Sequence, residues 1–204
     1  MKIGIIGTHG VGKTTICKFL SFYFGQLSAN SDVVIEVVRP LALEGLPMNE
    51  GTTMEAQEAV QYYQRVQEII AESRIAKGEI NHAIFDRTVI DNYVYAEHAF
   101  PKLAKERLYS QMISWIKQHP YDKIFLVPLW NKEKITADKF RSEGKKFQED
   151  IDKSLMVFLE KLDIVYEKIP AEIFLENKEL QILSLKKFFD SQFGQTITAK
   201  ENLS

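Results

Sequence analysis

The sequence predicts an α/β fold of three layers, in which a five-stranded parallel sheet is flanked by helices on both faces. Two observations lead to this expectation. Five short apolar segments have the length of strands, and longer segments with helical periodicity separate them. Strands that alternate with helices pair in parallel, because each helix carries the chain back to the starting edge of the sheet. The expected strands are residues 2–6, 33–38, 82–85, 123–128 and 164–169.

Helices fill the intervals between the strands, and the helix after the second strand is marked most clearly. Thr52 or Thr53 caps its start, and Glu55 is placed like the acid of a capping box. Gly78 ends this helix. Residues 40–51, rich in proline, glycine and asparagine, form the loop before it. The expected helices are residues 12–27, 53–77, 88–98, 102–118, 147–162 and 178–193.

The domain organisation follows from length and composition. The chain has 204 residues, of which 45% are hydrophobic and 26% charged, as in ordinary globular proteins. We expect one domain over residues 1–193, with a lid-like segment at about residues 131–146 and a flexible tail at residues 194–204. The single cysteine excludes an internal disulfide.

Charge and hydropathy restrict the cellular setting. The formal net charge of −2 gives no indication of a nucleic-acid or membrane surface. No apolar run reaches the roughly 18 residues needed to span a bilayer, and the first strand begins too close to Met1 to follow a signal peptide. The sequence therefore favours a cytoplasmic protein that binds neither nucleic acid nor membrane. It leaves the oligomeric state open, with a homodimer as one option.

The strongest functional signal is a phosphate-binding loop (P-loop) directly after the first strand. Its pattern is a glycine, four spacer residues and then Gly-Lys-Thr, followed by a helix. Glycines let successive backbone N–H groups turn toward phosphate oxygens, and the start of the following helix adds its positive dipole end. The expected ligand is a nucleoside triphosphate, which we take to be ATP. The predicted nucleotide-binding residues are Gly7, Thr8, His9, Gly10, Val11, Gly12, Lys13, Thr14 and Thr15.

Two residues of the loop have further roles, and Asp86 joins them. Lys13 reaches the β- and γ-phosphates, and the Thr14 hydroxyl is a ligand for Mg²⁺. Ligands of open α/β sheets bind beyond the carboxyl ends of the strands, where Asp86 follows the third strand. We expect Asp86 to hold Mg²⁺ together with Thr14, or to take a proton from an acceptor hydroxyl. The structural alternative is that Asp86 caps the next helix.

Three more charged residues are candidates for the acceptor side. Glu36, within the second strand, acts as a general base or pairs with Arg39. Arg87 suits a substrate phosphate or carboxylate, and a solvated surface charge is the alternative. Arg141, in the lid-like segment, closes over the transferring phosphate or stays an exposed charge. The predicted catalytic residues are Lys13, Asp86, Arg87, Glu36 and Arg141, and tyrosines that wall an acceptor pocket or pack in the core are Tyr62, Tyr63, Tyr93 and Tyr95.

Taken in order, these motifs resemble the nucleoside- and nucleotide-kinase branch of P-loop proteins, which implies the P-loop NTPase fold. In deoxynucleoside and thymidylate kinases an acid–arginine pair, here Asp86-Arg87, follows the third strand, and a lid with arginines precedes the last helices. The chain is more similar still to the AAA-domain ATPase/kinase-like family, which includes the nicotinamide riboside kinase domain of bifunctional NAD-biosynthesis proteins. This resemblance covers about residues 1–165. The segments that carry it are residues 36–40, 55–67, 85–88, 140–142 and 150–152.

Other classes of P-loop protein fit the residues less well. A GTPase would carry Asn-Lys-x-Asp after a late strand, whereas residues 131–134 end in lysine. A mechanical ATPase would end the third strand with two acids, whereas Arg87 follows Asp86. The sequence therefore predicts a kinase that transfers the γ-phosphoryl group of Mg·ATP to a nucleoside or nucleotide. The alternative is an ATP hydrolase or a nucleotide-dependent regulatory module of the same fold, and either Glu36 or Asp86 is the base.

Overall fold

The computed structural model describes residues 1–48, 51–130 and 145–201. The chain divides into two compact units, one from Met1 to Lys168 and one that begins at Ile169. The single domain expected over residues 1–193 stays a prediction, and most of its lid-like segment lies outside the described residues. Among the helices that are described, none has both the length and the apolar character of a membrane span.

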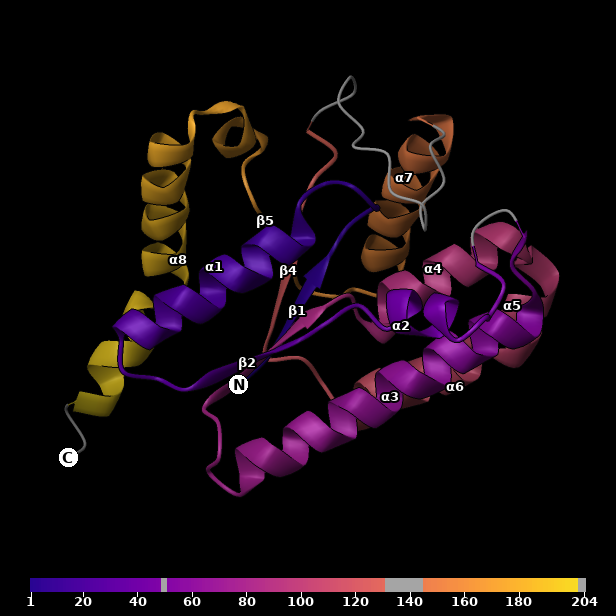
Figure 1. Ribbon diagram of the computed structural model, residues 1–204, viewed down its shortest axis with the longest axis horizontal. Helices are drawn as coiled ribbons and strands as arrows, with labels where there is room; N and C mark the ends of the chain where they lie inside the picture. Colours follow the sequence, from indigo (N-terminus) through magenta and orange to yellow (C-terminus); the bar gives the residue numbers. More distant parts are fainter. Residues whose placement is uncertain (49–50, 131–144, 202–204) are drawn as a thin grey trace. The chain divides into compact units, whose positions relative to one another are not determined.

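The first unit is built on a five-stranded parallel sheet with the order β2-β3-β1-β4-β5 (Figure 1). Helices flank this sheet, so the predicted α/β fold is confirmed. The central strand β1 is buried along its whole length, as expected for a parallel strand that is covered on both faces. The strands are β1 (Lys2–Ile6), β2 (Ser31–Val34), β3 (His82–Asp86), β4 (Lys123–Leu126) and β5 (Glu167–Lys168).

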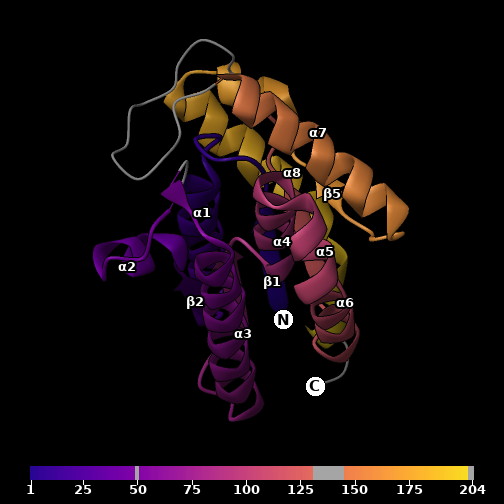
Figure 2. The same cartoon turned by 90° about the vertical axis from the view of Figure 1, so that its right-hand side faces the viewer.

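The helices of the first unit form the outer layers. Helix α1 lies along β1, β2 and β3 (Figure 1). Helices α3 to α6 lie on the other side of the strands, and this side faces the viewer in Figure 2. The helices are α1 (Lys13–Gln26), α2 (Val38–Leu43), α3 (Met54–Ala76), α4 (Val89–Ala99), α5 (Pro101–Arg107), α6 (Tyr109–Gln118) and α7 (Lys145–Lys161).

Two helical predictions need correction. Helix α2 forms in a region where the sequence predicts a loop. The single helix expected over residues 102–118 is divided at Leu108, whose φ of −112° departs from helical values while its side chain is buried in the core. The helix is thus interrupted at a residue that packs in the core, and helical periodicity in the sequence does not reveal this interruption.

Strand β2 begins and ends earlier than predicted. The sequence favours residues 33–38, whereas β2 pairs Ser31 with His82 and ends where Val34 pairs with Phe85. Beyond the strand the chain turns, and Val37 packs into an apolar cluster with Leu41 and Val60. Glu36 thus follows the strand and does not lie within it. The last strand is also shorter than the predicted residues 164–169, because only two residues pair with β4.

Helix caps agree with the sequence in one position and differ in another. Thr53 caps α3 by accepting a hydrogen bond of 3.2 Å from the Ala56 amide, as predicted. Because the cap is Thr53, Glu55 lies one position too early to be the acid of a capping box. A capping box is present at α4, where Thr88 is the cap and its amide donates a hydrogen bond to the carboxylate of Asp91.

Gly4 sets a close contact between β1 and the start of α4. A Cβ atom at this position would lie 2.6 Å from the methyl carbon of Thr88. Real Cβ atoms do not come so near to another heavy atom, so only glycine fits without displacing Thr88.

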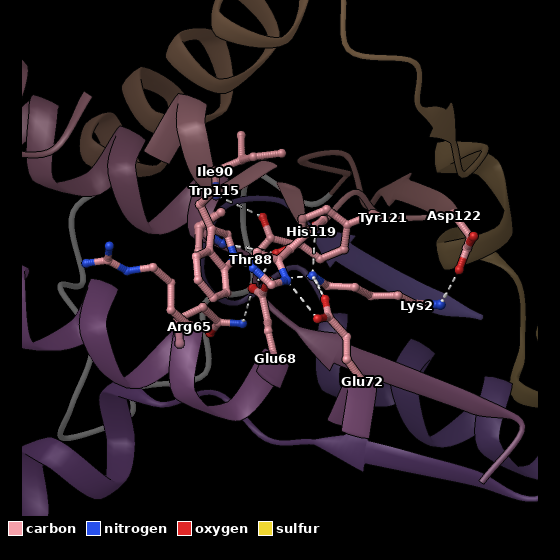
Figure 3. A network of polar contacts seen from close by, with 12 residues as sticks. Lys2, Arg65, Glu68, Glu72, Thr88, Ile90, Trp115, His119, Tyr121 and Asp122 are labelled. Atoms are coloured by element: carbon pink, nitrogen blue, oxygen red, sulfur yellow. Dashed lines mark hydrogen bonds and ion pairs between the residues drawn. The ribbon is translucent and has the colours of Figure 1, made fainter. Parts of the chain in front are cut away.

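A buried polar network surrounds Lys2 at the start of β1 (Figure 3). Its ammonium lies 2.8 Å from carboxylate oxygens of both Glu68 and Glu72, which point toward it from α3. It also donates a hydrogen bond of 2.9 Å to the carbonyl of His119. Buried charges need such pairing, since the desolvation of an unpaired ion costs several kcal/mol.

Glu68 is fully buried and accepts hydrogen bonds from three elements. Trp115 Nε1 of α6 donates at 2.8 Å, and the Tyr121 hydroxyl before β4 donates at 2.5 Å. Gln64, one turn earlier on α3, donates at 3.1 Å. Burial, with the nearby charge of Glu68 as a second cause, raises the pKa of Tyr121 well above its usual range. The network thus binds α3, α6 and β1 together at the amino end of the sheet.

The second unit contains a short 3₁₀ helix, η2 (Ala171–Leu175), and the helix α8 (Lys178–Glu201). Phe189 and Phe193 of α8 are buried, and their rings stack at 6.1 Å. The helix extends to Glu201, beyond the predicted helix end at residue 193.

Candidate nucleotide-binding and active site

The P-loop connects β1 to α1, as predicted. Gly7, Gly10 and Gly12 all have positive φ values, of 142°, 76° and 101°. At Gly7 a Cβ atom would also lie 2.5 Å from the carbonyl oxygen of Val127. Glycine is therefore required at this position both by its backbone conformation and by the close approach of the chain after β4.

Lys13 lies inside the loop and is 6% exposed. Its ammonium donates hydrogen bonds to the carbonyls of Gly7, at 3.0 Å, and Thr8, at 2.7 Å. Burial, together with the nearby charge of Arg87, lowers the pKa of Lys13 to about 8. A phosphate beside this ammonium would favour its charged form, because an anion offsets the cost of burial.

Thr14 and Asp86 meet at the edge of the loop. The Thr14 hydroxyl donates a 2.5 Å hydrogen bond to Oδ2 of Asp86, so two oxygen ligands from the loop and from β3 are adjacent. Mg²⁺ prefers oxygen ligands, and it takes one or two from the protein and the rest from phosphates and water. The pair fits Mg²⁺ in this way, and the described residues contain no cluster of three or more His, Cys, Asp or Glu for a metal held by the protein alone.

The structural alternative for Asp86, that it caps the next helix, is wrong. Thr88 is the cap of α4, since its hydroxyl accepts a hydrogen bond of 3.1 Å from the amide of Ile90. Asp91 completes this cap, because its carboxylate accepts a hydrogen bond of 2.5 Å from the Thr88 amide. Because Thr88 and Asp91 satisfy the helix start, the carboxylate of Asp86 is directed to the loop.

Arg87 is a buried cation, so the alternative of a solvated surface charge is wrong. Its side chain is 6% exposed and forms an ion pair with Glu36, and its Nη1 lies 3.7 Å from Asp91 Oδ2. Burial is the largest influence and opposes the charge, but Glu36, Tyr95 and Asp91 together outweigh it and raise the pKa of Arg87 well above its usual range. The backbone of Arg87 has a φ of 88°, which is uncommon for a residue with a side chain, and strained conformations of this kind cluster at functional sites.

Glu36 follows β2 and does not lie within a strand as predicted. Its side chain is 13% exposed and pairs with Arg87, while Arg39 is exposed on α2. The structure therefore brings together Lys13, Asp86, Arg87 and Glu36. The fifth predicted catalytic residue, Arg141, lies outside the described residues, as does the segment 131–134.

Asp91 adds a third carboxyl group to this cluster, beside Asp86 and Glu36, which the sequence singles out. It is fully buried, and burial raises its pKa to about 6 although Arg87 and Lys13 oppose this. Its carboxylate is held in this buried position by the capping box of α4. Its second carboxylate oxygen lies toward Arg87, which thus stands between two acids.

Three side chains from other elements hold the spacer of the loop. Trp130, after β4, donates a hydrogen bond of 2.8 Å to the carbonyl of Val11. Gln148 of α7 donates one of 2.8 Å to the carbonyl of His9, and the Tyr95 hydroxyl accepts one of 2.8 Å from the amide of His9. The position of Trp130 beyond a strand end is the only sequence signal for these contacts.

The four tyrosines expected at an acceptor pocket or in the core have three different settings. Tyr93 is fully buried in the core, and Tyr62 and Tyr63 are exposed. Only Tyr95 contacts the loop. The tyrosines thus do not form one wall, and Tyr95 alone is a candidate for a functional role.

Comparison with known proteins agrees with this geometry. The family model described as AAA domain matches residues 2–175. No curated protein matches the sequence. Deoxyadenosine kinase from M. mycoides, solved with dCMP and dCDP, shares 19% identity over 94% of this chain and 100% of its own, with a TM-score of 0.65.

A second similar structure is the NadR protein. In complex with NR it is 20% identical over 82% of this chain with a TM-score of 0.65, and in complex with NAD and AMP-PNP it is 19% identical with a TM-score of 0.62. The match spans only 44% and 43% of the two NadR chains. These identities establish a common fold alone. Because the family model matches most of its length, the chain belongs to the AAA-domain family, and it has the fold of P-loop kinases.

Proposed function

We propose that the protein is a small-molecule kinase that transfers the γ-phosphoryl group of Mg·ATP to a nucleoside or nucleotide. The observation that carries the proposal is the arrangement of two pairs at the loop. Thr14 and Asp86 form a magnesium-type pair, and Glu36 and Arg87 form an ion pair beside them. The first pair serves any nucleotide-dependent reaction, whereas the second supplies groups for an acceptor.

On the donor side, backbone amides of the loop and Lys13 hold the phosphates. Thr14 and Asp86 would hold Mg²⁺, which neutralises charge on the β- and γ-phosphate oxygens. Lys13 already lies against the loop carbonyls, so it needs only to exchange these partners for phosphate oxygens. Catalysis by such a site is mainly positioning and charge stabilisation.

On the acceptor side, Arg87 neutralises charge and one of two carboxylates takes the proton of the acceptor hydroxyl. Glu36 is partly exposed and sits next to Arg87, which suits a base that a substrate can approach. Asp86 is 4% exposed and is engaged with Thr14, which suits the metal better. We therefore assign the base to Glu36 and the metal to Asp86.

The ligands of similar structures guide the choice of acceptor. Those structures were solved with dCMP, dCDP, dATP, NR, NAD and AMP-PNP. A nucleoside or nucleotide acceptor agrees with these ligands, and an ATP-using reaction of this kind agrees with the cytoplasmic setting that the sequence favours. An ATP hydrolase is supported less well, since an arginine follows Asp86 where a second acid would activate water.

A screen of ATP consumption tests the proposal directly. The purified chain is incubated with Mg·ATP and, one at a time, nucleosides, nucleoside monophosphates and nicotinamide riboside. We expect ADP formation to rise at least tenfold with one acceptor and a phosphorylated product to appear in equal amount. ADP formation at the same rate without any acceptor would instead identify a hydrolase. Absence of turnover with retained Mg·ATP binding would identify a regulatory module.

A further inference from the structure

Tyr95 of α4 contacts both the P-loop and Arg87. Its hydroxyl accepts the 2.8 Å hydrogen bond from the His9 amide, and the same oxygen lies 3.2 Å from His9 Nδ1. The guanidinium carbon of Arg87 lies 4.6 Å from the centre of the Tyr95 ring. The Tyr95 side chain thus contacts both His9, in the P-loop, and Arg87, the cation that we propose for the acceptor side.

The hydroxyl of Tyr95 fixes the spacer of the loop. His9 is 3% exposed, so loss of the Tyr95 hydroxyl would cost its amide this hydrogen bond in a buried setting. The residue after His9 is Gly10, whose φ of 76° begins the turn of the loop. Anchoring His9 therefore restricts the conformations that the flexible glycine can adopt before a nucleotide binds.

The ring of Tyr95 supports Arg87 from a second direction. Glu36 and Asp91 hold the guanidinium by charge, and the aromatic face adds a cation–π contact. A planar cation that is stacked on a ring keeps its orientation better than one held by charge alone. The orientation of Arg87 relative to the loop is thus set through Tyr95.

Helix α7 closes the other side of His9. The Phe147 ring lies 5.6 Å from the ring of His9 and 6.0 Å from that of Tyr95. Gln148, the next residue, donates to the His9 carbonyl at 2.8 Å. Both backbone polar groups of His9 are therefore bound to side chains of other elements, so its position in the loop is held from two sides.

We propose that Tyr95 is a positioning residue that aligns the donor and acceptor halves of the site. Its hydroxyl sets the P-loop through His9, and its ring and hydroxyl together set Arg87. In-line transfer depends on this alignment, because small displacements of the reacting groups lower the rate strongly. The kinetic part of this inference rests on the proposed kinase function, whereas the positioning of His9 and Arg87 does not.

Two variants of Tyr95 separate the contacts of its hydroxyl, with His9 and Arg87, from the contact of its ring with Arg87. Tyr95→Phe removes the hydroxyl and keeps the ring, and Tyr95→Leu removes both. Tyr93→Phe is the matched control, since Tyr93 lies on the same helix and its hydroxyl bonds to Glu97, away from the loop. NMR of each variant without nucleotide follows the His9 amide and the Arg87 Nε–H. Calorimetry with Mg·AMP-PNP and steady-state kinetics follow binding and turnover.

We expect Tyr95→Phe to increase solvent exchange of the His9 amide about tenfold and to weaken Mg·AMP-PNP binding about three- to tenfold. It should shift the Arg87 Nε–H signal only slightly, because the hydroxyl also bonds to Arg87 but the ring contact remains. Tyr95→Leu should shift the Arg87 Nε–H signal further, because the ring current is lost as well, and should lower kcat about 10- to 100-fold. Tyr93→Phe should change none of these values by more than twofold.

The inference is overturned if both Tyr95 variants keep the His9 and Arg87 signals of the wild type. It is also overturned if Tyr95→Leu lowers thermal stability but changes neither kcat nor the KM for ATP, which would make the residue purely structural. Failure of the wild type to consume ATP with any acceptor would refute the kinase proposal alone. In that case the NMR signals and the Mg·AMP-PNP affinity still decide whether Tyr95 sets the loop and Arg87.

Discussion

The hydroxyl of Thr14 donates its hydrogen bond to Oδ2 of Asp86 across 72 residues of sequence. This contact joins the start of α1 to the end of β3, and it places two oxygens where a metal beside the phosphates would bind. Thr14 is exposed whereas Asp86 is buried. The proposed metal site is therefore open on the side of the loop and fixed on the side of the sheet.

Replacing Asp86 should separate metal use from nucleotide binding. In Asp86→Asn we expect turnover to fall by about 10²-fold or more, since the amide is a poorer ligand for Mg²⁺. Binding of ATP without magnesium should change little, and the gain in affinity that magnesium gives should be lost. Calorimetry with and without Mg²⁺ measures both. Asp163→Asn, at an exposed position after α7, is the control, and equal turnover in the two variants would remove Asp86 from the mechanism.

Lys13 should be essential for binding the triphosphate. We expect Lys13→Ala to weaken Mg·ATP binding by at least 100-fold, because the loop loses its only cation among the predicted binding residues. Lys18→Ala removes an exposed lysine of the same helix and should bind normally. Tight binding of Mg·ATP by Lys13→Ala would count against the assignment of the loop.

The affinity for Mg·ATP should depend on pH through Lys13. Burial and Arg87 lower the pKa of its ammonium to about 8, and bound phosphate would raise it again. Below pH 8 the ammonium is charged in both states, so the affinity should be constant. Above pH 8 the free protein must take up a proton when it binds, and the affinity should fall by up to about tenfold per pH unit. A flat profile to pH 10 would show that Lys13 is charged throughout.

The Glu36–Arg87 pair should contribute to stability as well as to chemistry. In Glu36→Gln the buried Arg87 loses its main counter-charge, and we expect the free energy of unfolding to fall by about 2–4 kcal/mol. Arg87→Met combined with Glu36→Gln should be less destabilised than the sum of the single variants. Urea unfolding of the four proteins gives this coupling, and additive losses would mean that the two side chains do not depend on each other.

The network around Lys2 should matter for stability alone. Glu68 is fully buried and Glu72 is 31% exposed. We expect Glu68→Gln to lower the free energy of unfolding by about 3–5 kcal/mol, and Glu72→Gln by about 1 kcal/mol. Mg·ATP affinity should stay within twofold in both, because the network lies at the amino end of the strands. Loss of nucleotide binding in a folded Glu68→Gln protein would contradict this separation.

Much of the donor side could be predicted from the sequence because it is local. The P-loop needs glycines, a lysine and a threonine at fixed spacing, and the strand before it and the helix after it are also continuous in sequence. The acid at the end of β3 follows from a general rule for parallel sheets. The structure places Gly7, Lys13, Thr14 and Asp86 accordingly.

The remaining contacts depend on packing between distant segments. The apolar residues on both sides of Glu36 continue past the true end of β2, so the end of the strand is set by its pairing with β3 and not by composition. The buried Arg87 pairs with Glu36, which lies 51 positions earlier in the sequence. Tyr95 contacts His9, which lies 86 positions earlier. No periodicity in the sequence reports such a relation.

Gly4 illustrates how a residue without any ligand contact can restrict a site. Its missing side chain admits the methyl group of Thr88, the residue that follows Arg87 and Asp86 in sequence. An inherited change to alanine would look harmless, since it adds one carbon atom in the middle of an apolar strand. It would nevertheless push on the segment that carries both charged groups. A genetic survey of this protein should therefore weigh variants at Gly4 with those of the proposed catalytic residues.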